Sequence, residues 1–155
     1  MEEDKIKLNI EKFILFHRDR VALLEGFLRD NVHHKLTIQI CFLGFESLAK
    51  LLYPKMRSGE RFIELLSIPN MGVRKEEASK LYEDWRCSLI HEGFIASPWT
   101  CLEDWGDGDI RFLSFPGTYK SSTEYPSGSI VAMYRSRIDY LEEFFKKKHI
   151  KEILI

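Results

Sequence analysis

The stretch of residues 32–53 constrains the fold most, because apolar side chains cover much of its circumference when it is wound as a helix. A helix of this kind needs neighbours on several sides and therefore belongs at the centre of a bundle. Pro54 ends the helix, and Asp30 and Asn31 offer a polar break and an N-cap before it. We expect an all-α fold organised around this second helix.

Three further segments have helical periodicity. Apolar residues recur every three or four positions over residues 6–29, with His17 on the same stripe, and again over residues 130–148. Residues 74–95 have the same spacing, with Glu76 and Glu77 in the first turns. These segments are the expected first, last and third helices.

The connections are unequal in length. Residues 54–72 contain proline, glycine and serine around one short helical turn at 62–66. Residues 97–129 lack helical period, but alternation over 110–115, followed by Pro-Gly and by residues 118–120, predicts a β-hairpin. We expect one domain over residues 1–155, an up-and-down bundle of four main helices with a long irregular or β-hairpin insertion before the last helix.

Charge and length limit the classes of function. The chain has 155 residues, enough for one domain with a sizeable core. Its 23 basic and 24 acidic residues nearly cancel, so the protein as a whole does not attract a polyanion. Any contact with RNA must come from a local patch.

Cysteine usage and the N-terminus indicate a compartment. Cys41, Cys87 and Cys101 form an odd set without a CxxC pair, which suits a reducing environment and makes a structural zinc site unexpected. Residues 1–9 are too charged for a signal peptide, and the apolar runs stop well short of the ~20 residues that span a bilayer. We expect a soluble, cytoplasmic protein with no membrane contact.

Residues 85–93 place an arginine, a thiol, a hydroxyl, an imidazole and a carboxylate near the end of the third helix. In an α-helix, residues five apart differ by about 140° around the axis, so Arg86 and His91 do not share a face. Asp84, Cys87, Ser88 and His91 do form one polar stripe. Arg86 therefore reaches that stripe obliquely, or reaches the stripe of another copy.

A homodimer packed through the third helix would bring the two sets together. Isologous contact places Arg86 and His91 of each copy close to the same pair in the other copy. Two guanidiniums and two imidazoles suit a phosphodiester, because arginine binds phosphate bidentately and histidine moves protons near neutral pH. A phosphodiester is the ligand class that this arrangement predicts.

Arg86, four intervening residues and His91, late in the third helix of a small helical protein with a central second helix, resemble the HEPN superfamily. The flanking Trp85 and Ile90-His91-Glu92-Gly93 look similar too, and the resemblance covers residues 6–95 and the last helix. It implies a metal-independent endoribonuclease without a cofactor, whose paired Arg-x4-His motifs cut RNA through its own 2′-hydroxyl. Many such proteins are toxins, which implies an antitoxin partner.

Under this resemblance Arg86 and His91 are the catalytic residues, and Asp84 or Glu46 orients them. Glu46 lies in the central helix among apolar neighbours, where a carboxylate needs a partner or a solvated groove. One position departs from the family: Cys87 stands where Asn, Asp or His is common, so Ser88 or Asp84 would have to supply the missing polar contact. The alternative is a non-catalytic HEPN module that binds a nucleotide, RNA or a partner protein.

Structural interpretations of the same residues also stand. Arg86 at a helix end can pair with Asp84 or Glu92, and His91 can cap terminal carbonyls. Cys87 and His91, four apart, would suit a thiol nucleophile and its base, or Cys87 is a buried structural cysteine.

Two further features permit either a role with RNA or a structural one. The basic run at 146–151 would guide an RNA backbone, or it is a solvated helix end. Trp99, Trp105 and Tyr119 would stack on bases, or they hold the long connection against the bundle.

Overall fold

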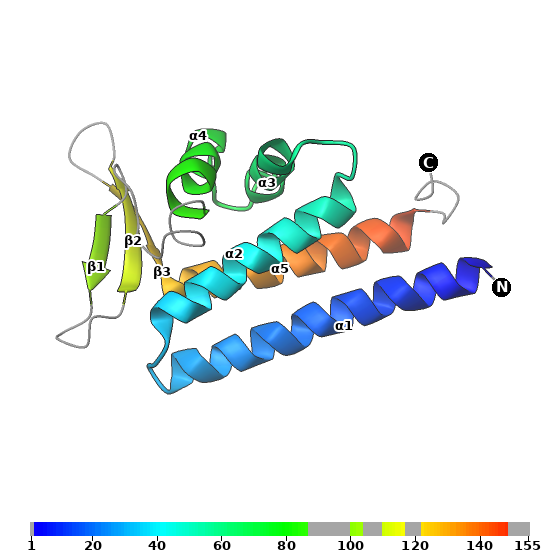
Figure 1. The fold of residues 1–155 in the computed structure, drawn as a ribbon, viewed down its shortest axis with the longest axis horizontal. Helices are drawn as coiled ribbons and strands as arrows, with labels where there is room; N and C mark the ends of the chain where they lie inside the picture. The colour runs from blue at the N-terminus through cyan, green and yellow to red at the C-terminus, as the bar shows by residue number, and fades with distance from the viewer. Residues whose placement is uncertain (1, 87–99, 104–109, 117–121, 149–155) are drawn as a thin grey trace.

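The computed structural model describes residues 2–86, 100–103, 110–116 and 122–148. Within these ranges three long helices form the body, and two short helices, one π-helical segment and three strands complete it (Figure 1). The elements in chain order are α1 (Glu2–Arg29), α2 (His34–Leu52), α3 (Ser58–Leu66), α4 (Lys75–Lys80), the π-helical η1 (Leu81–Arg86), β1 (Thr100–Glu103), β2 (Ile110–Pro116), β3 (Ser122–Pro126) and α5 (Ser127–Lys147).

The body is layered. Helix α5 packs against both α1 and α2, and α3 packs against α2 (Figure 1). Helices α3 and α4 lie on the side of the α2–α5 layer away from α1. The helical character expected from the sequence is therefore confirmed. Helix α2 contacts α1, α3 and α5, and among its described side chains only Leu36, Leu43 and Lys50 are exposed.

The ends of α1 carry the charges that a helix dipole favours, whereas the start of α2 differs from the one expected. Helix α1 begins with Glu2, Glu3 and Asp4 and ends with Arg29, each complementing the helix dipole. The expected N-cap at Asp30 or Asn31 is wrong: α2 begins at His34, after His33 with φ of 56° and no side-chain cap. The Asn31 side chain lies 3.0 Å from the His34 ring, which diverts it from the helix backbone.

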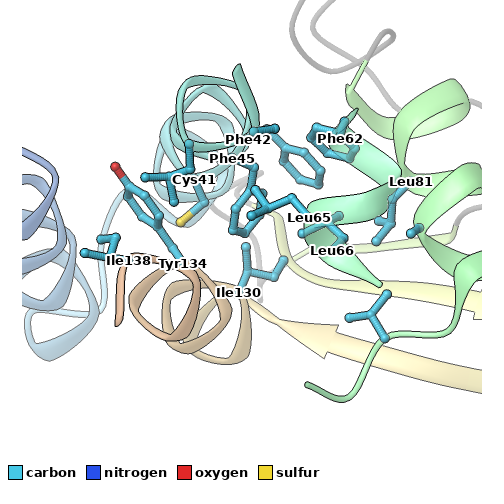
Figure 2. Close-up of a cluster of buried hydrophobic side chains, with 14 of the residues drawn as sticks. Cys41, Phe42, Phe45, Phe62, Leu65, Leu66, Leu81, Ile130, Tyr134 and Ile138 are labelled. Carbon is cyan, nitrogen blue, oxygen red and sulfur yellow. The ribbon is translucent and has the colours of Figure 1, made fainter. Parts of the chain in front are cut away.

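The core is built around aromatic rings from α2, α3 and α5 (Figure 2). Phe42 stacks on Phe62 with ring centroids 5.8 Å apart, and Phe45 meets Tyr134 edge to face at the same separation. A Cβ at Gly44 would lie 2.4 Å from Cζ of Tyr134, so only glycine lets this ring lie against the α2 backbone. Gly44 thus sets how closely α2 and α5 approach.

The strands form one small antiparallel sheet in the order β1-β2-β3. Strand β2 coincides with the alternating segment of the sequence. Its second antiparallel partner is β3, at Ser122–Pro126, and Pro116 is paired with Ser122. Residues 118–120, where the return of the hairpin was expected, lie outside the described residues. Strand β1 adds to the other edge of β2 and was not expected at all. The insertion is therefore more regular than a single hairpin.

Candidate functional site

The sequence-predicted site residues divide into two groups. The structure describes the backbone at Asp84 and Arg86, both in η1, and the whole of Glu46 in α2. Cys87, Ser88 and His91 lie outside the described residues. The described residues therefore include the backbone of Arg86 but not His91, and the proximity of the two side chains stays a prediction.

The third helix is not a continuous α-helix. It is α-helical over α4 and then π-helical over η1, whose last residue is Arg86. In a π-helix the hydrogen bonds run between residues five apart, so the angular spacing of an α-helix does not apply across this segment. Asp84 lies within η1, whereas the other residues of the expected polar stripe lie outside the described residues, so the stripe stays a prediction. Single π turns inside helices occur frequently at functional sites.

The π segment is held against α3 by packing. Leu81 is buried in the core, and the Tyr82 ring lies 5.4 Å from the Phe62 ring. A Cβ at Gly59 would lie 2.9 Å from Cε1 of Tyr82, so the tyrosine sits almost on the α3 backbone. Arg86 follows four residues after Tyr82, about one helical turn along the same segment. The contact between Tyr82 and Gly59 therefore anchors the backbone about one turn before Arg86.

Helix α4, which leads into η1, contains a buried carboxylate, that of Glu77. The Glu77 carboxylate is 2% exposed, and Nε of Arg74 donates to its Oε1 at 2.5 Å. Arg74 is the residue before the helix, so the ion pair fastens the start of α4 onto its first turns. From the sequence, Arg74 and Glu77 were expected only as part of the third helix, without this ion pair.

Glu46 reaches the same corner of the molecule from α2. It is partly buried, and the Ser58 hydroxyl donates to its Oε1 at 3.4 Å. Ser58 is the first residue of α3, and the next residue, Gly59, lies against Tyr82 of η1. A chain of contacts therefore links Glu46 to the π segment through the start of α3.

Two of the other buried polar residues, His17 and Arg137, pack within the helical body. His17 is fully buried on the apolar stripe of α1, and its Nδ1 meets the Tyr134 hydroxyl. Arg137 is 1% exposed, and Nη2 donates to the Leu66 carbonyl at 2.6 Å. Sequence reasoning placed His17 on the stripe and missed Arg137, whose only signal was its position beside Tyr134 and Ile138 on the stripe of the last helix.

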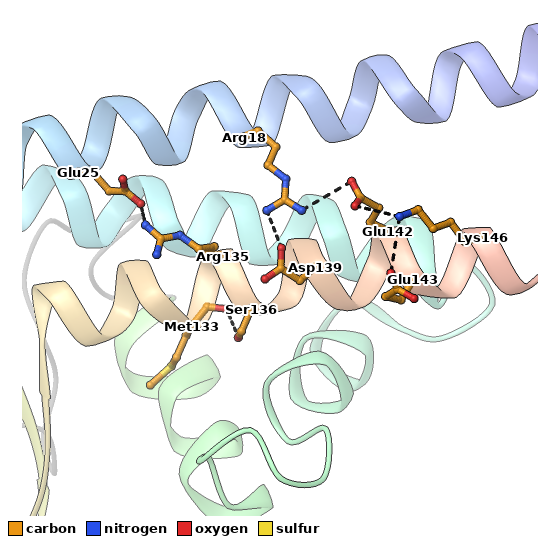
Figure 3. Close-up of polar contacts among 9 residues, drawn as sticks. All are labelled: Arg18, Glu25, Met133, Arg135, Ser136, Asp139, Glu142, Glu143 and Lys146. Carbon is orange, nitrogen blue, oxygen red and sulfur yellow. Dashed lines mark hydrogen bonds and ion pairs between the residues drawn. The ribbon is translucent and has the colours of Figure 1, made fainter.

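The remaining predicted features are described in part. Lys146 lies 3.5 Å from Glu142 and 3.6 Å from Glu143, so the first residue of the basic run belongs to a group of ion pairs on α5 (Figure 3). Cys41 is a free, buried cysteine whose pKa is raised by burial. Trp99, Trp105 and Tyr119 lie outside the described residues.

The described ranges contain no group of three or more His, Cys, Asp or Glu residues that could hold a metal ion. None of the helices in these ranges is long and apolar enough to cross a membrane. Comparison of the chain with protein-family models, with curated proteins and with solved structures gives no match. The inference of function rests on the chain's own residues.

Proposed function

We propose that this protein is a metal-independent endoribonuclease of the HEPN type, with a site shared across a homodimer through the third helix. The observation that carries the proposal is the Arg86-x4-His91 motif, which starts at the last residue of the π segment. A packed π turn supports this assignment because such turns concentrate at functional sites. The helical body with a central second helix agrees with the fold that the resemblance implies.

Each residue of the proposed site has a defined role. Arg86 holds the scissile phosphate and stabilises the charge that develops on it. His91 takes the proton from the attacking 2′-hydroxyl or returns one to the departing 5′-oxygen, work suited to an imidazole near neutral pH. The RNA supplies its own nucleophile, so neither step needs a cofactor.

Glu46 is proposed to orient this machinery from the second helix. Its contact with Ser58 leads through Gly59 and Tyr82 to the segment that carries Arg86. We propose Asp84 and Ser88 as further polar support, since Cys87 beside the motif arginine is a weak hydrogen-bonding group. Glu46→Gln should therefore reduce the rate without abolishing it.

The protein would act in the cytoplasm, and an antitoxin would be its partner if it is a toxin of this family. The second candidate function is a non-catalytic module that binds a nucleotide, RNA or a partner protein through the same surface. Cys87 is the feature that favours it, because it occupies a position where catalytic members commonly have Asn, Asp or His.

Cleavage of RNA in excess EDTA tests the proposal. Purified protein should cut single-stranded RNA, and Arg86→Ala or His91→Ala should each slow cleavage by about 100-fold or more, as expected for loss of charge stabilisation or proton transfer. Arg57→Ala, at an exposed arginine before α3, is the matched control and should leave the rate unchanged. A bell-shaped pH profile is expected for the active protein.

Mixing the two inactive variants tests whether the site is shared. If each site takes residues from both protomers, Arg86→Ala mixed with His91→Ala should recover part of the activity that neither has alone. No recovery of activity in the mixture would exclude the shared site. Absence of wild-type cleavage above the level of the Arg86→Ala/His91→Ala double variant would exclude the nuclease. Saturable RNA binding without product, measured by fluorescence anisotropy, would then identify the binding module instead.

A further inference from the structure

Helix α1 has a second apolar stripe that the fold does not use. Its inward side buries His17, Val21 and Leu24 against the body. Four large apolar side chains on α1 remain about half exposed: Leu8 at 48%, Leu15 at 59%, Phe16 at 55% and Leu23 at 54%. One apolar stripe is sufficient to dock a surface helix, so the second stripe calls for a partner.

The exposed residues gather on one outward face. At 3.6 residues per turn, the four apolar residues and the exposed Lys12 and Asp19 lie within about 50° of one direction. That direction is about 150° from the side that carries the buried residues. The main contacts of α1 in the described chain are with α5 and α2, and α1 is the outermost helix on its side of the molecule (Figure 1).

The outward face is symmetric about the midpoint between Leu15 and Phe16. Three pairs of positions are equidistant from that midpoint: Leu8 and Leu23, Lys12 and Asp19, and Leu15 and Phe16. A two-fold axis through the midpoint would run an antiparallel copy of α1 along the first, with apolar residues facing apolar residues. It would also place each Lys12 opposite an Asp19.

The charges select this arrangement over the alternatives. In a parallel pair at the same register, Lys12 would face Lys12 and Asp19 would face Asp19, which is repulsive. In the antiparallel pair both central contacts are attractive. Glu11 and Arg20 are also equidistant from the midpoint, at the edges of the face, and would add a second charge pair at the rim.

We propose that the outward face of α1 is a self-association surface, which takes an antiparallel second copy of this chain. The contact between positions 8 and 23 is about 22 Å long. A single pair of helices is at the lower end of the size of stable interfaces, about 1,200 Å² in total, so the dimer should dissociate on dilution.

The α1 surface is independent of the proposed nuclease site. Helix α4 lies on the opposite side of the α2–α5 layer from α1, so a dimer through one surface leaves the other open (Figure 1). A protein that uses both surfaces would form a closed tetramer of two-fold symmetry or an open chain of copies. Self-association and RNA cleavage can therefore be tested separately.

Sedimentation velocity over a wide range of protein concentration tests the proposal. The wild-type chain should show a concentration-dependent association step in addition to any dimer formed through the third helix. Leu15→Glu should weaken that step by about tenfold or more because it buries a charge at the two-fold axis. Leu43→Glu, at a residue of α2 that is 46% exposed, is the matched control and should leave association unchanged. Circular dichroism checks that each variant is folded.

A charge exchange tests the antiparallel register. Lys12→Asp places two carboxylates opposite each other and Asp19→Lys places two ammonium groups opposite each other, so each should weaken association. The double variant Lys12→Asp/Asp19→Lys restores opposite charges and should recover wild-type association.

Three results would overturn the proposal: a monomeric wild-type chain at every concentration, a dimer that Leu15→Glu leaves unchanged, or a double variant as weak as the single ones. In the second case self-association would use another surface, and the third helix would be the next candidate for that surface. Absence of RNA cleavage would overturn the proposed function and leave the α1 surface untouched.

Discussion

His17 lies in the contact between α1 and α5, where its ring packs against Phe13 with centroids 4.5 Å apart. Its Nδ1 meets the hydroxyl of Tyr134, while Nε2 is buried and has no hydrogen-bond partner among the described residues. Burial, and to a smaller extent the nearby positive charge of Arg20, lower the pKa of His17 to about 4. Burial also raises the pKa of Tyr134 to about 12. Both groups are therefore neutral at physiological pH.

This neutrality predicts a loss of stability in mild acid. The folded pKa of His17 is below the ordinary value of 6.5, so between these values the unfolded chain binds a proton that the folded chain does not. The contribution is complete above pH 6.5 and is lost as pH falls towards 4. The free energy of unfolding should drop by about 2 kcal/mol between pH 7 and pH 5 through this group alone.

Urea denaturation of the wild type and of His17→Gln at both pH values measures the effect. Glutamine is neutral at either pH, so the variant should lose about 2 kcal/mol less than the wild type over the same interval. Equal losses in the two proteins would mean that His17 binds its proton equally well folded and unfolded.

At the scale of the elements, Arg137 connects α5 to the end of α3. The carbonyls of Leu65 and Leu66 at the C-terminus of α3 accept hydrogen bonds from its Nε at 3.3 Å and its Nη2 at 2.6 Å. Both Nη atoms also donate to the Met71 carbonyl, at 3.4 and 3.3 Å. Burial lowers the pKa of Arg137 to about 10, so the guanidinium stays charged and complements the dipole of α3.

Replacing Arg137 should therefore loosen α3 more than α1. Arg137→Met leaves buried carbonyls without donors and should reduce the free energy of unfolding by about 3 kcal/mol. Arg137→Lys keeps the charge without the planar fork and should recover only part of the loss. Urea denaturation gives the size of the effect, and amide hydrogen exchange should be fastest over residues 58–72. An Arg137→Met protein as stable as the wild type would show that solvent satisfies these carbonyls.

The sequence predicted the long helices well because each has a continuous apolar stripe. Helices α1, α2 and α5 lie within a few residues of their expected bounds. The start of α2 was misplaced because the helix follows His33, which has a left-handed conformation and no side-chain cap, and not a polar N-cap at Asp30 or Asn31. Strand β1 was missed because it is only four residues long and its pairing partner follows in β2.

For the candidate site, the sequence shows the residue types and their spacing but not the helix type of the segment that carries them. The Arg-x4-His spacing is visible in the sequence, but the π-helical segment before it and the packing of its Tyr82 against Gly59 of α3 are not. Apolar periodicity cannot register a change of helix type over six residues. The link from Glu46 to Ser58 was hidden for the same reason, since it joins two helices.

At the scale of the whole molecule, α1 is attached through an apolar strip flanked by ion pairs. Arg18 lies 2.6 Å from Asp139 and 3.6 Å from Glu142, and Arg135 pairs with Glu25 (Figure 3). These side chains are about a third or more exposed, whereas Leu24 between α1 and the body is fully buried. The two kinds of contact should differ sharply in strength.

A comparison of Arg18→Gln with Leu24→Ala measures that difference. Exposed ion pairs contribute at most about 1 kcal/mol because solvent screens them and two long side chains must be ordered. Removing a buried leucine side chain costs about 2–5 kcal/mol through lost burial and the cavity left behind. Arg18→Gln should therefore leave urea denaturation almost unchanged, while Leu24→Ala should shift it strongly in a single transition. Equal effects of the two substitutions would mean that charge, and not apolar packing, attaches α1 to the rest of the protein.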